Sequence, residues 1–132
     1  MFREASPFSG YSVNDIEEAK TFYGEMLGIE MDDTGMGLEL RFPNGHHVFI
    51  YEKEDHEPAS YTVLNFPVDD IDVAVDSLME AGIVMQRYAH MPGDQDSRGI
   101  LRGKSAGMGP DIAWFEDPAG NILAVLDATL DA

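Results

Sequence analysis

The chain has 132 residues, 44% of them hydrophobic, which is the size of one domain built around a single core. It contains no cysteine, and this excludes disulfides, thiolate catalysis and cysteine-bound zinc. Its formal net charge of −17 would repel nucleic acid and anionic lipid, and no stretch approaches the roughly 20 apolar residues that cross a bilayer. We therefore expect neither nucleic acid nor a membrane as a partner.

The first elements predicted along the chain are a strand and a helix. Residues 1–7 carry no basic stretch followed by an apolar run, so we expect no secretion signal and a cytoplasmic location. Asn14, with Glu17 three residues later, resembles a capping box, and Gly28 supplies the left-handed cap that ends the helix. Between them, apolar residues recur at helical spacing and are assigned to the core: Ile16, Ala19, Phe22, Tyr23, Met26 and Leu27.

A hairpin turn at residues 42–45 leads into the apolar run 48–51. Adjacent residues on a strand point to opposite faces, so His46 and His47 do not form a chelating pair, and we expect both to face solvent. Glu52 could become a metal ligand only in a shifted register. The polar segment that follows, including His56, predicts a linker at about residues 52–59.

The second half of the chain repeats the first at an offset of 55 residues, with residues 11–19 matching residues 66–74. A second helix begins near Ile71 and ends at Gly82, and a second hairpin turn at 117–120 precedes a final strand. The repeat predicts one domain over residues 1–132, made of a module at about 5–55 and a module at about 60–128. Neither module can bury a core alone, so the two pack together within one chain or by exchange between two chains.

The segment from Gln86 to Pro110 differs from its surroundings because it is rich in glycine and charge and poor in apolar residues. A loop of this length is typical of a lid or a disordered segment. If it covers a cavity, His90, Arg98 or Arg102 would touch a bound ligand; the alternative is that all three are simply solvated.

Two motifs carry a resemblance to a known family. Val13 to Ile16 followed by Phe22 to Gly28, together with residues 114–121 before the last strand, resembles the glyoxalase, bleomycin-resistance and extradiol dioxygenase superfamily, also called the vicinal oxygen chelate superfamily. The resemblance spans nearly the whole chain. It implies an α+β fold in which two βαβββ modules with curved mixed sheets enclose a cavity, with a homodimer as the working unit.

Enzymes of this family hold a divalent metal through His, Glu or Gln on the first strand and on a later strand of each module. Carried over to this sequence, those positions are Phe8, Val63, Ala124, and either Phe49 or Ile50. All are hydrocarbon side chains without a lone pair to offer, and a Lewis acid needs such donors. We therefore predict no metal, no cofactor and no catalytic residue.

If these positions still face a cavity, strand alternation predicts a mostly apolar small-molecule pocket. In it, Trp114 supplies a flat stacking surface and Asn65 orients the ligand; the alternative is that the same residues simply fill the core. The predicted ligand-binding residues are Phe8, Ser12, Ile50, Val63, Asn65, Arg102, Trp114 and Ala124.

Three functions are compatible with such a pocket. The first is a metal-free protein that sequesters a hydrophobic or cationic compound, and the second is a glyoxalase-like lyase or dioxygenase with an atypical metal site. The third is a module of the same fold that only binds another protein. The acidity favours a cationic ligand, but it is equally typical of a protein adapted to a salty environment.

Overall fold

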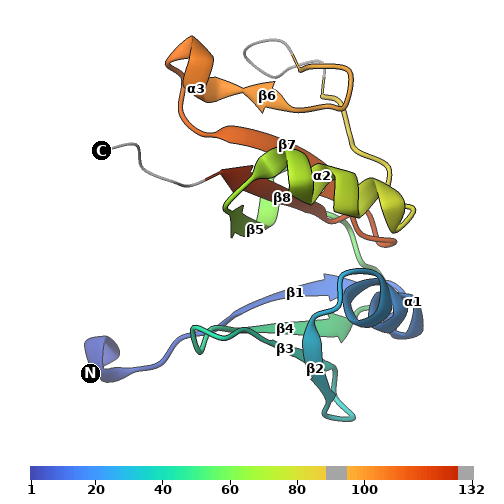
Figure 1. The fold of residues 1–132 in the computed structure, drawn as a ribbon. Helices are drawn as coiled ribbons and strands as arrows, with labels where there is room; N and C mark the ends of the chain where they lie inside the picture. Colours follow the sequence, from blue (N-terminus) through green and yellow to red (C-terminus); the bar gives the residue numbers. More distant parts are fainter. Residues whose placement is uncertain (89–94, 128–132) are drawn as a thin grey trace. The chain divides into compact units, whose positions relative to one another are not determined.

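The computed structural model describes residues 1–88 and 95–127, and the chain separates into two compact units, Met1–Pro58 and Ala59–Ala132. Each unit consists of a four-stranded sheet with one longer helical segment (Figure 1). The predicted α+β class is confirmed. No helix in the described part of the chain has the length and apolar character needed to cross a membrane.

The first unit has the strand order β1-β4-β3-β2, in which β1 runs parallel to β4 and the other neighbours are antiparallel. The helix is α-helical at its start and continues without a break into a π-helical stretch, with Phe22 and Tyr23 buried. The elements are η1 (Phe2–Glu4), β1 (Ser9–Val13), α1 (Ile16–Lys20), η2 (Thr21–Met26), β2 (Glu30–Asp33), β3 (Leu38–Arg41) and β4 (His47–Glu52).

Alternation along the strands divides this sheet into two faces. One face packs against the helix: the Tyr11 hydroxyl donates to the Tyr23 hydroxyl at 2.9 Å. The core on this side is fully buried and includes Val13, Leu38, Leu40, Val48 and Ile50. The opposite side, called here the helix-free face of the first sheet, carries Ser12, Glu39, Arg41, His47, Phe49 and Tyr51.

The second unit repeats this order as β5-β8-β7-β6, with β5 parallel to β8. The helix α2 lies against β7 and β8 (Figure 1). The elements are β5 (Thr62–Val68), α2 (Ile71–Glu80), β6 (Leu101–Arg102), α3 (Gly103–Ala106), β7 (Asp111–Glu116) and β8 (Ile122–Asp127).

The ends of the helices confirm the repeat and correct one residue. The N-cap of α1 is Asp15, whose carboxylate accepts from two backbone N–H groups, and not Asn14. Asp70, 55 residues later, caps α2 in the same way. After each helix a glycine adopts positive φ as predicted, +69° at Gly28 and +89° at Gly82.

The described parts of the segment from Gln86 to Pro110, residues 86–88 and 95–110, contain ordered pairing, unlike the lid or disordered segment that its composition is typical of. Gln86 pairs with Trp114, and Leu101 pairs with Ile112 on the same strand, β7. The side-chain amide nitrogen of Gln95 donates to the backbone carbonyls of Gln86 at 3.1 Å and Gly99 at 2.6 Å. These bonds join Gln95 to both sides of the described segment.

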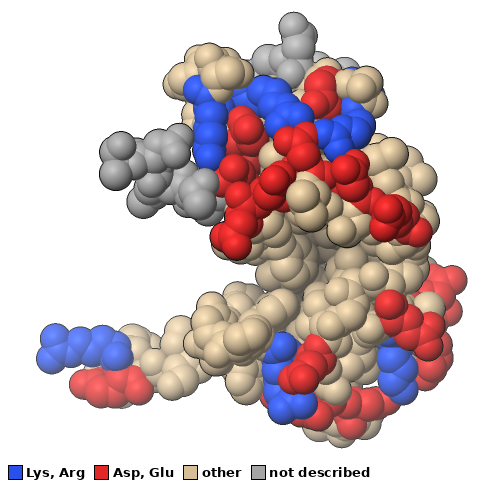
Figure 2. Space-filling model, in the orientation of Figure 1, with Lys and Arg blue, Asp and Glu red and all other residues tan. Residues whose placement is uncertain are grey.

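The returning part of this segment is fastened to α2 by charge. Arg98 and Arg102 both bind the Asp72 carboxylate, and Arg98 also binds Asp76 at 2.6 Å. Arg102 further reaches Asp96 at 3.2 Å. Figure 2 shows Lys and Arg side chains gathered with Asp and Glu side chains over α2 and β6. This group of Asp72, Asp76, Asp96, Arg98 and Arg102 is called here the α2 ion-pair cluster.

The cluster predicts a specific response to acid. The hydrogen bond from Arg102 holds the pKa of Asp72 below its ordinary 3.8, so this carboxylate stabilises the fold above about pH 4 and the contribution disappears as pH falls further. Because the side chain is 47% exposed, solvent screens the effect, and we expect about 1 kcal/mol. Asp72→Asn should therefore lower stability at pH 7 and flatten its decline as the pH falls below about 5.

The emission of Trp114, the single tryptophan, follows unfolding of this unit. Asp69→Asn, an exposed carboxylate three residues earlier, is the control and should leave the pH profile unchanged. Equal acid sensitivity in Asp72→Asn and the parent protein would contradict the assignment.

Candidate functional site

The register of the strands decides which residues occupy the metal-ligand positions. Gly10 pairs with Phe49 in the first sheet, and Asn65, 55 residues after Gly10, pairs with Ala124 in the second. Phe49 is therefore the counterpart of Ala124, and each lies four residues after a turn glycine of positive φ. Between the two residues that the sequence left open, the structure selects Phe49.

Ile50 lies on the other side of the sheet. It is fully buried on the helix-covered face, where its partners are Tyr11 and Leu38. Because successive side chains of a strand alternate, Ile50 cannot share a wall with Ser12, which pairs with Tyr51. The structure thus places Ile50, one of the predicted ligand-binding residues, in the core of the first unit.

The residues at these positions do not fit a divalent metal. Phe8, directly before β1, is 66% exposed, and Ala124 is fully buried. In residues 1–88 and 95–127 no three His, Asp or Glu side chains lie close enough together to hold an ion. Glu52 is used otherwise, because its carboxylate accepts from the backbone N–H of Ile16 at 3.0 Å and caps the first helix.

Two aromatic rings form the centre of the helix-free face of the first sheet. Phe49 and Tyr51 stack with their centroids 5.9 Å apart and their planes at 20°. The Phe49 ring lies over Gly37, where a Cβ atom would come within 2.8 Å of the ring, and Tyr51 remains 37% exposed. Gly10, the β1 partner of Phe49, adds no side chain, so the rings have a bare backbone beside them.

A hydroxyl and an imidazole lie next to this aromatic pair. Ser12 Oγ is 2.6 Å from Nδ1 of His56, and Ser12 pairs with Tyr51 across β1 and β4. His56, which the sequence places in the linker, is half-buried. The chain after β4 turns back and places His56 beside β1, a contact that no local pattern reports.

An arginine–carboxylate ion pair and a histidine–carboxylate contact occupy the other side of Phe49 on the same face. Arg41 Nε lies 3.1 Å from Asp32, and His47 Nδ1 lies 3.0 Å from Glu39. His47 shares a face with Phe49 and Tyr51, because the three residues alternate along β4. The face therefore presents aromatic rings between hydrogen-bonding groups, which suits a flat ligand with one or two polar atoms.

In the second sheet the register brings three predicted residues together, since Ala124 pairs with both Asn65 and Trp114. Trp114 is only 6% exposed: Nε1 donates to Thr62 Oγ1 at 3.2 Å, and the Tyr88 ring meets it edge-on at 6.1 Å. Its ring is therefore packed within this unit and does not present the open stacking surface that the sequence predicted. Asn65 is exposed on the same face.

Three further predicted residues have different outcomes. Val63 lies where β5 is irregular, and the register shift between Thr62 and Leu64 breaks the expected alternation. Arg102 is engaged in the α2 ion-pair cluster and pairs with Asp111, on the face opposite Trp114, so the structure does not bring it to Asn65. His90 lies outside the described residues.

Sequence reasoning missed Tyr88, whose hydroxyl donates to Glu116 at 3.1 Å. Burial, together with the neighbouring carboxylate, raises the pKa of this phenol above its ordinary value, so the hydroxyl stays protonated and keeps its role as donor. The residue falls in the segment that looked like a loop, and nothing in that segment signalled a packed aromatic ring.

Two helix-backed mixed sheets with the same strand order define a protein of the βαβββ-repeat class. The family model of the Glyoxalase/Bleomycin resistance protein/Dioxygenase superfamily matches residues 8–125, and the chain belongs to this superfamily. The resemblance identified in the sequence is thereby confirmed.

Solved structures with the same fold cover almost the whole chain. The glyoxalase family protein from Enterococcus faecalis shares 20% identity at a TM-score of 0.65, covering 96% of this chain and 100% of its own. The fosfomycin resistance protein FosX from Listeria monocytogenes shares 14% at 0.66, covering 96% and 94%. TnmS3, an antibiotic binding protein from Streptomyces sp. CB03234, shares 22% at 0.61, covering 93% and 96%. No curated protein sequence matches the chain significantly.

Proposed function

We propose that this protein binds a small aromatic or hydrophobic molecule, preferably a cationic one, without a metal ion of its own. The observation that carries the proposal is the stacked pair Phe49 and Tyr51 on the helix-free face of the first sheet. Phe49 stands at a position where the family resemblance implies a metal ligand, and a phenyl ring offers a π surface where a carboxylate or imidazole would offer lone pairs.

The electrostatics of this face favour a cation. An aromatic ring attracts a cation to its π face, and such contacts stabilise by about 0.5–2 kcal/mol. Glu39 lies beside Phe49 on β3, and the net charge of −17 raises the local concentration of cations around the whole molecule. Ser12 and His56, close to Tyr51, supply polar atoms that orient a ligand.

Structural relatives support the general proposal that the protein binds a small molecule. TnmS3 is described as an antibiotic binding protein, and FosX as a fosfomycin resistance protein. In our proposal the two predicted modules, about residues 5–55 and 60–128, enclose the ligand within one chain or across a homodimer in the cytoplasm. Sedimentation analysis of the purified protein measures that oligomeric state directly.

The proposal predicts that N-methylquinolinium, a planar aromatic cation, raises the melting temperature more than neutral quinoline of the same size. Tyr51→Ala should weaken binding of the cation about 10-fold, because it removes one of the two stacked rings, while Tyr51→Phe should retain most of it. Calorimetric titration with both compounds provides the measurement.

Phe2→Ala, which removes an 85% exposed aromatic ring outside the strands, is the matched control and should change neither affinity. Metal analysis of the purified protein separates the alternatives. Stoichiometric bound metal would favour an enzyme with an atypical site over this proposal. If neither compound binds and no metal is present, the remaining function is that of a protein-interaction module.

A further inference from the structure

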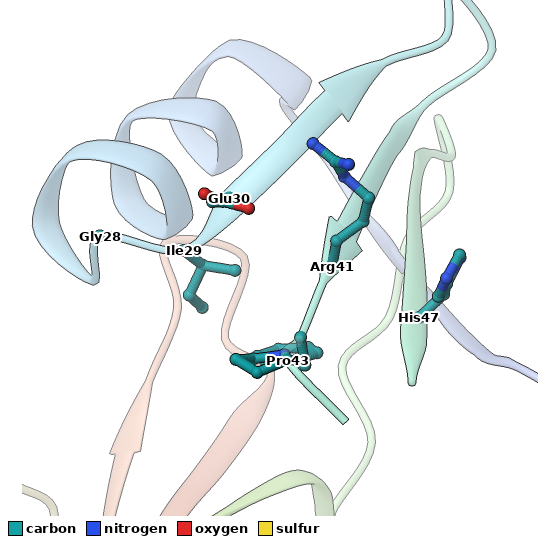
Figure 3. A pocket seen from close by; sticks show the side chains of 7 residues that line it. Gly28, Ile29, Glu30, Arg41, Pro43 and His47 are labelled. Carbon is teal, nitrogen blue, oxygen red and sulfur yellow. The ribbon is translucent and has the colours of Figure 1, made fainter. Parts of the chain in front are cut away.

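A pocket of about 670 Å³ lies within the first unit, at the end of the sheet where β2 begins and the β3–β4 hairpin turns. Its wall combines three polar and three apolar side chains, labelled in Figure 3 except for Phe42: Ile29, Glu30, Arg41, Phe42, Pro43 and His47. The function proposed above rests on Phe49 and Tyr51; Arg41 and His47 lie on the same face as these rings, and the pocket adds Glu30 and the apolar residues.

The polar residues form a single row across three strands. Glu30 pairs with Arg41, and Arg41 pairs with His47, so all three lie on the helix-free face at one level. The next row contains Asp32, which pairs with Glu39. The row that lines the pocket therefore has a carboxylate, a guanidinium and an imidazole in that order, and neighbouring strands are about 4.8 Å apart.

The second row holds the Arg41 and His47 side chains of the first in place. Asp32 binds Arg41 through Nε at 3.1 Å, and Glu39 binds His47 through Nδ1 at 3.0 Å. A guanidinium fastened at Nε keeps its terminal N–H groups for a second carboxylate, which it binds with paired hydrogen bonds. Arg41 is in this way oriented before any ligand arrives.

Glu30 differs from the carboxylates of the second row in its ion pairing. Within the described parts of the chain no Lys, Arg or His lies within ion-pair distance of Glu30, although Arg41 is its partner in the strand register. In Figure 3 the carboxylate of Glu30 and the guanidinium of Arg41 lie apart from each other at the pocket wall. The row thus offers separate places for a cationic and an anionic group.

This separation fits one class of small molecule. In an α-amino acid the ammonium and the carboxylate are about 3 Å apart, and a hydrogen bond of about 2.9 Å at each end extends this reach to side chains that lie apart from each other. His47 Nε2 adds a contact on the far side of Arg41, as acceptor or donor according to its protonation. The apolar wall of Ile29, Phe42 and Pro43 suits an apolar side chain.

We propose that this pocket binds an α-amino acid with an apolar side chain, its ammonium on Glu30 and its carboxylate on Arg41. This site is additional to the function proposed above, and an experiment can contradict either proposal without contradicting the other. Because both charged groups of the ligand are recognised, a molecule lacking either one should bind more weakly.

Three probes of nearly the same size test this by calorimetric titration: L-phenylalanine, 2-phenylethylamine and 3-phenylpropionate. We expect L-phenylalanine to bind about 10-fold more tightly than either singly charged analogue, since each carries one charge-assisted contact fewer. Glu30→Gln should remove the preference for L-phenylalanine over 3-phenylpropionate. Arg41→Gln should remove its preference over 2-phenylethylamine.

Glu25→Gln is the matched control, because it makes the same change of charge at an exposed residue of η2 outside the pocket wall. Thermal denaturation verifies that each variant is folded. Equal affinities for the three probes, no binding of L-phenylalanine at about 10 mM, or an equal loss in Glu25→Gln and Glu30→Gln would overturn the proposal. Tyr51→Ala should leave L-phenylalanine binding intact, so failure of one proposal is distinguishable from failure of the other.

Discussion

Gly37→Ala is expected to lower the free energy of unfolding by about 3 kcal/mol, a large share of the stability of a small domain. The added Cβ would lie 2.5 Å from the Ile50 carbonyl oxygen and 2.8 Å from Cζ of Phe49. The carbonyl belongs to the backbone of β4, which cannot withdraw without breaking the sheet. The ring can move only by leaving Tyr51, so the same variant should also weaken binding of the aromatic cation.

Gly24→Ala serves as the control for this prediction. Its added Cβ would meet only the terminal methyl of Met31 at 2.9 Å, the end of a flexible side chain. Because Gly24 lies inside η2, alanine should also gain helix propensity, so we expect a change of less than about 1 kcal/mol. Urea denaturation followed by circular dichroism compares the two variants. Equal midpoints would show that the strand tolerates the Cβ.

Ile100→Ala is expected to lower the free energy of unfolding by about 3 kcal/mol, because it leaves a cavity at a fully buried residue. Ile100 lies in the segment whose composition is typical of a loose lid. If the segment is a packed part of the second unit, the truncation should shift the urea midpoint measured by Trp114 emission. Removing the Asp72 interactions should add to the loss.

Val84→Ala removes apolar surface from a 73% exposed residue and should stay within about 0.5 kcal/mol of the parent protein. A similarly small effect of Ile100→Ala would mean that residues 95–102 do not contribute to the folded core.

Much of the architecture could be predicted from the sequence, because it rests on short-range patterns. The apolar stripe of the first helix, the caps that end both helices at Gly28 and Gly82, and the two hairpin turns depend on residues within a few places of each other. The repeat at an offset of 55 carried the strand order from one unit to the other. Errors of one residue, such as Asn14 in place of Asp15 at the cap, left the architecture unchanged.

The candidate site was predicted less well, because its composition depends on register. A shift of one residue exchanges the two faces of a strand, so Phe49 and Ile50 could not be separated until the pairing of β1 with β4 was known. The irregularity near Val63 had the same effect in β5. The aromatic pair, and the contact of Ser12 with His56, join residues that only the folded chain brings together.

The sequence by itself determined the α+β class, the repeat, the family and the hydrocarbon side chains at the implied metal-ligand positions, since each follows from residue type and local periodicity. The tertiary structure alone decided which side chains share a face and which charges are already paired. In the folded chain Ile50 is buried in the core and Arg102 forms an ion pair with Asp72. Among the described residues Glu30 has no cationic partner, because Arg41 binds Asp32. The physical reason is that strand pairing and ion pairing join residues far apart in the chain, where local preference has no influence.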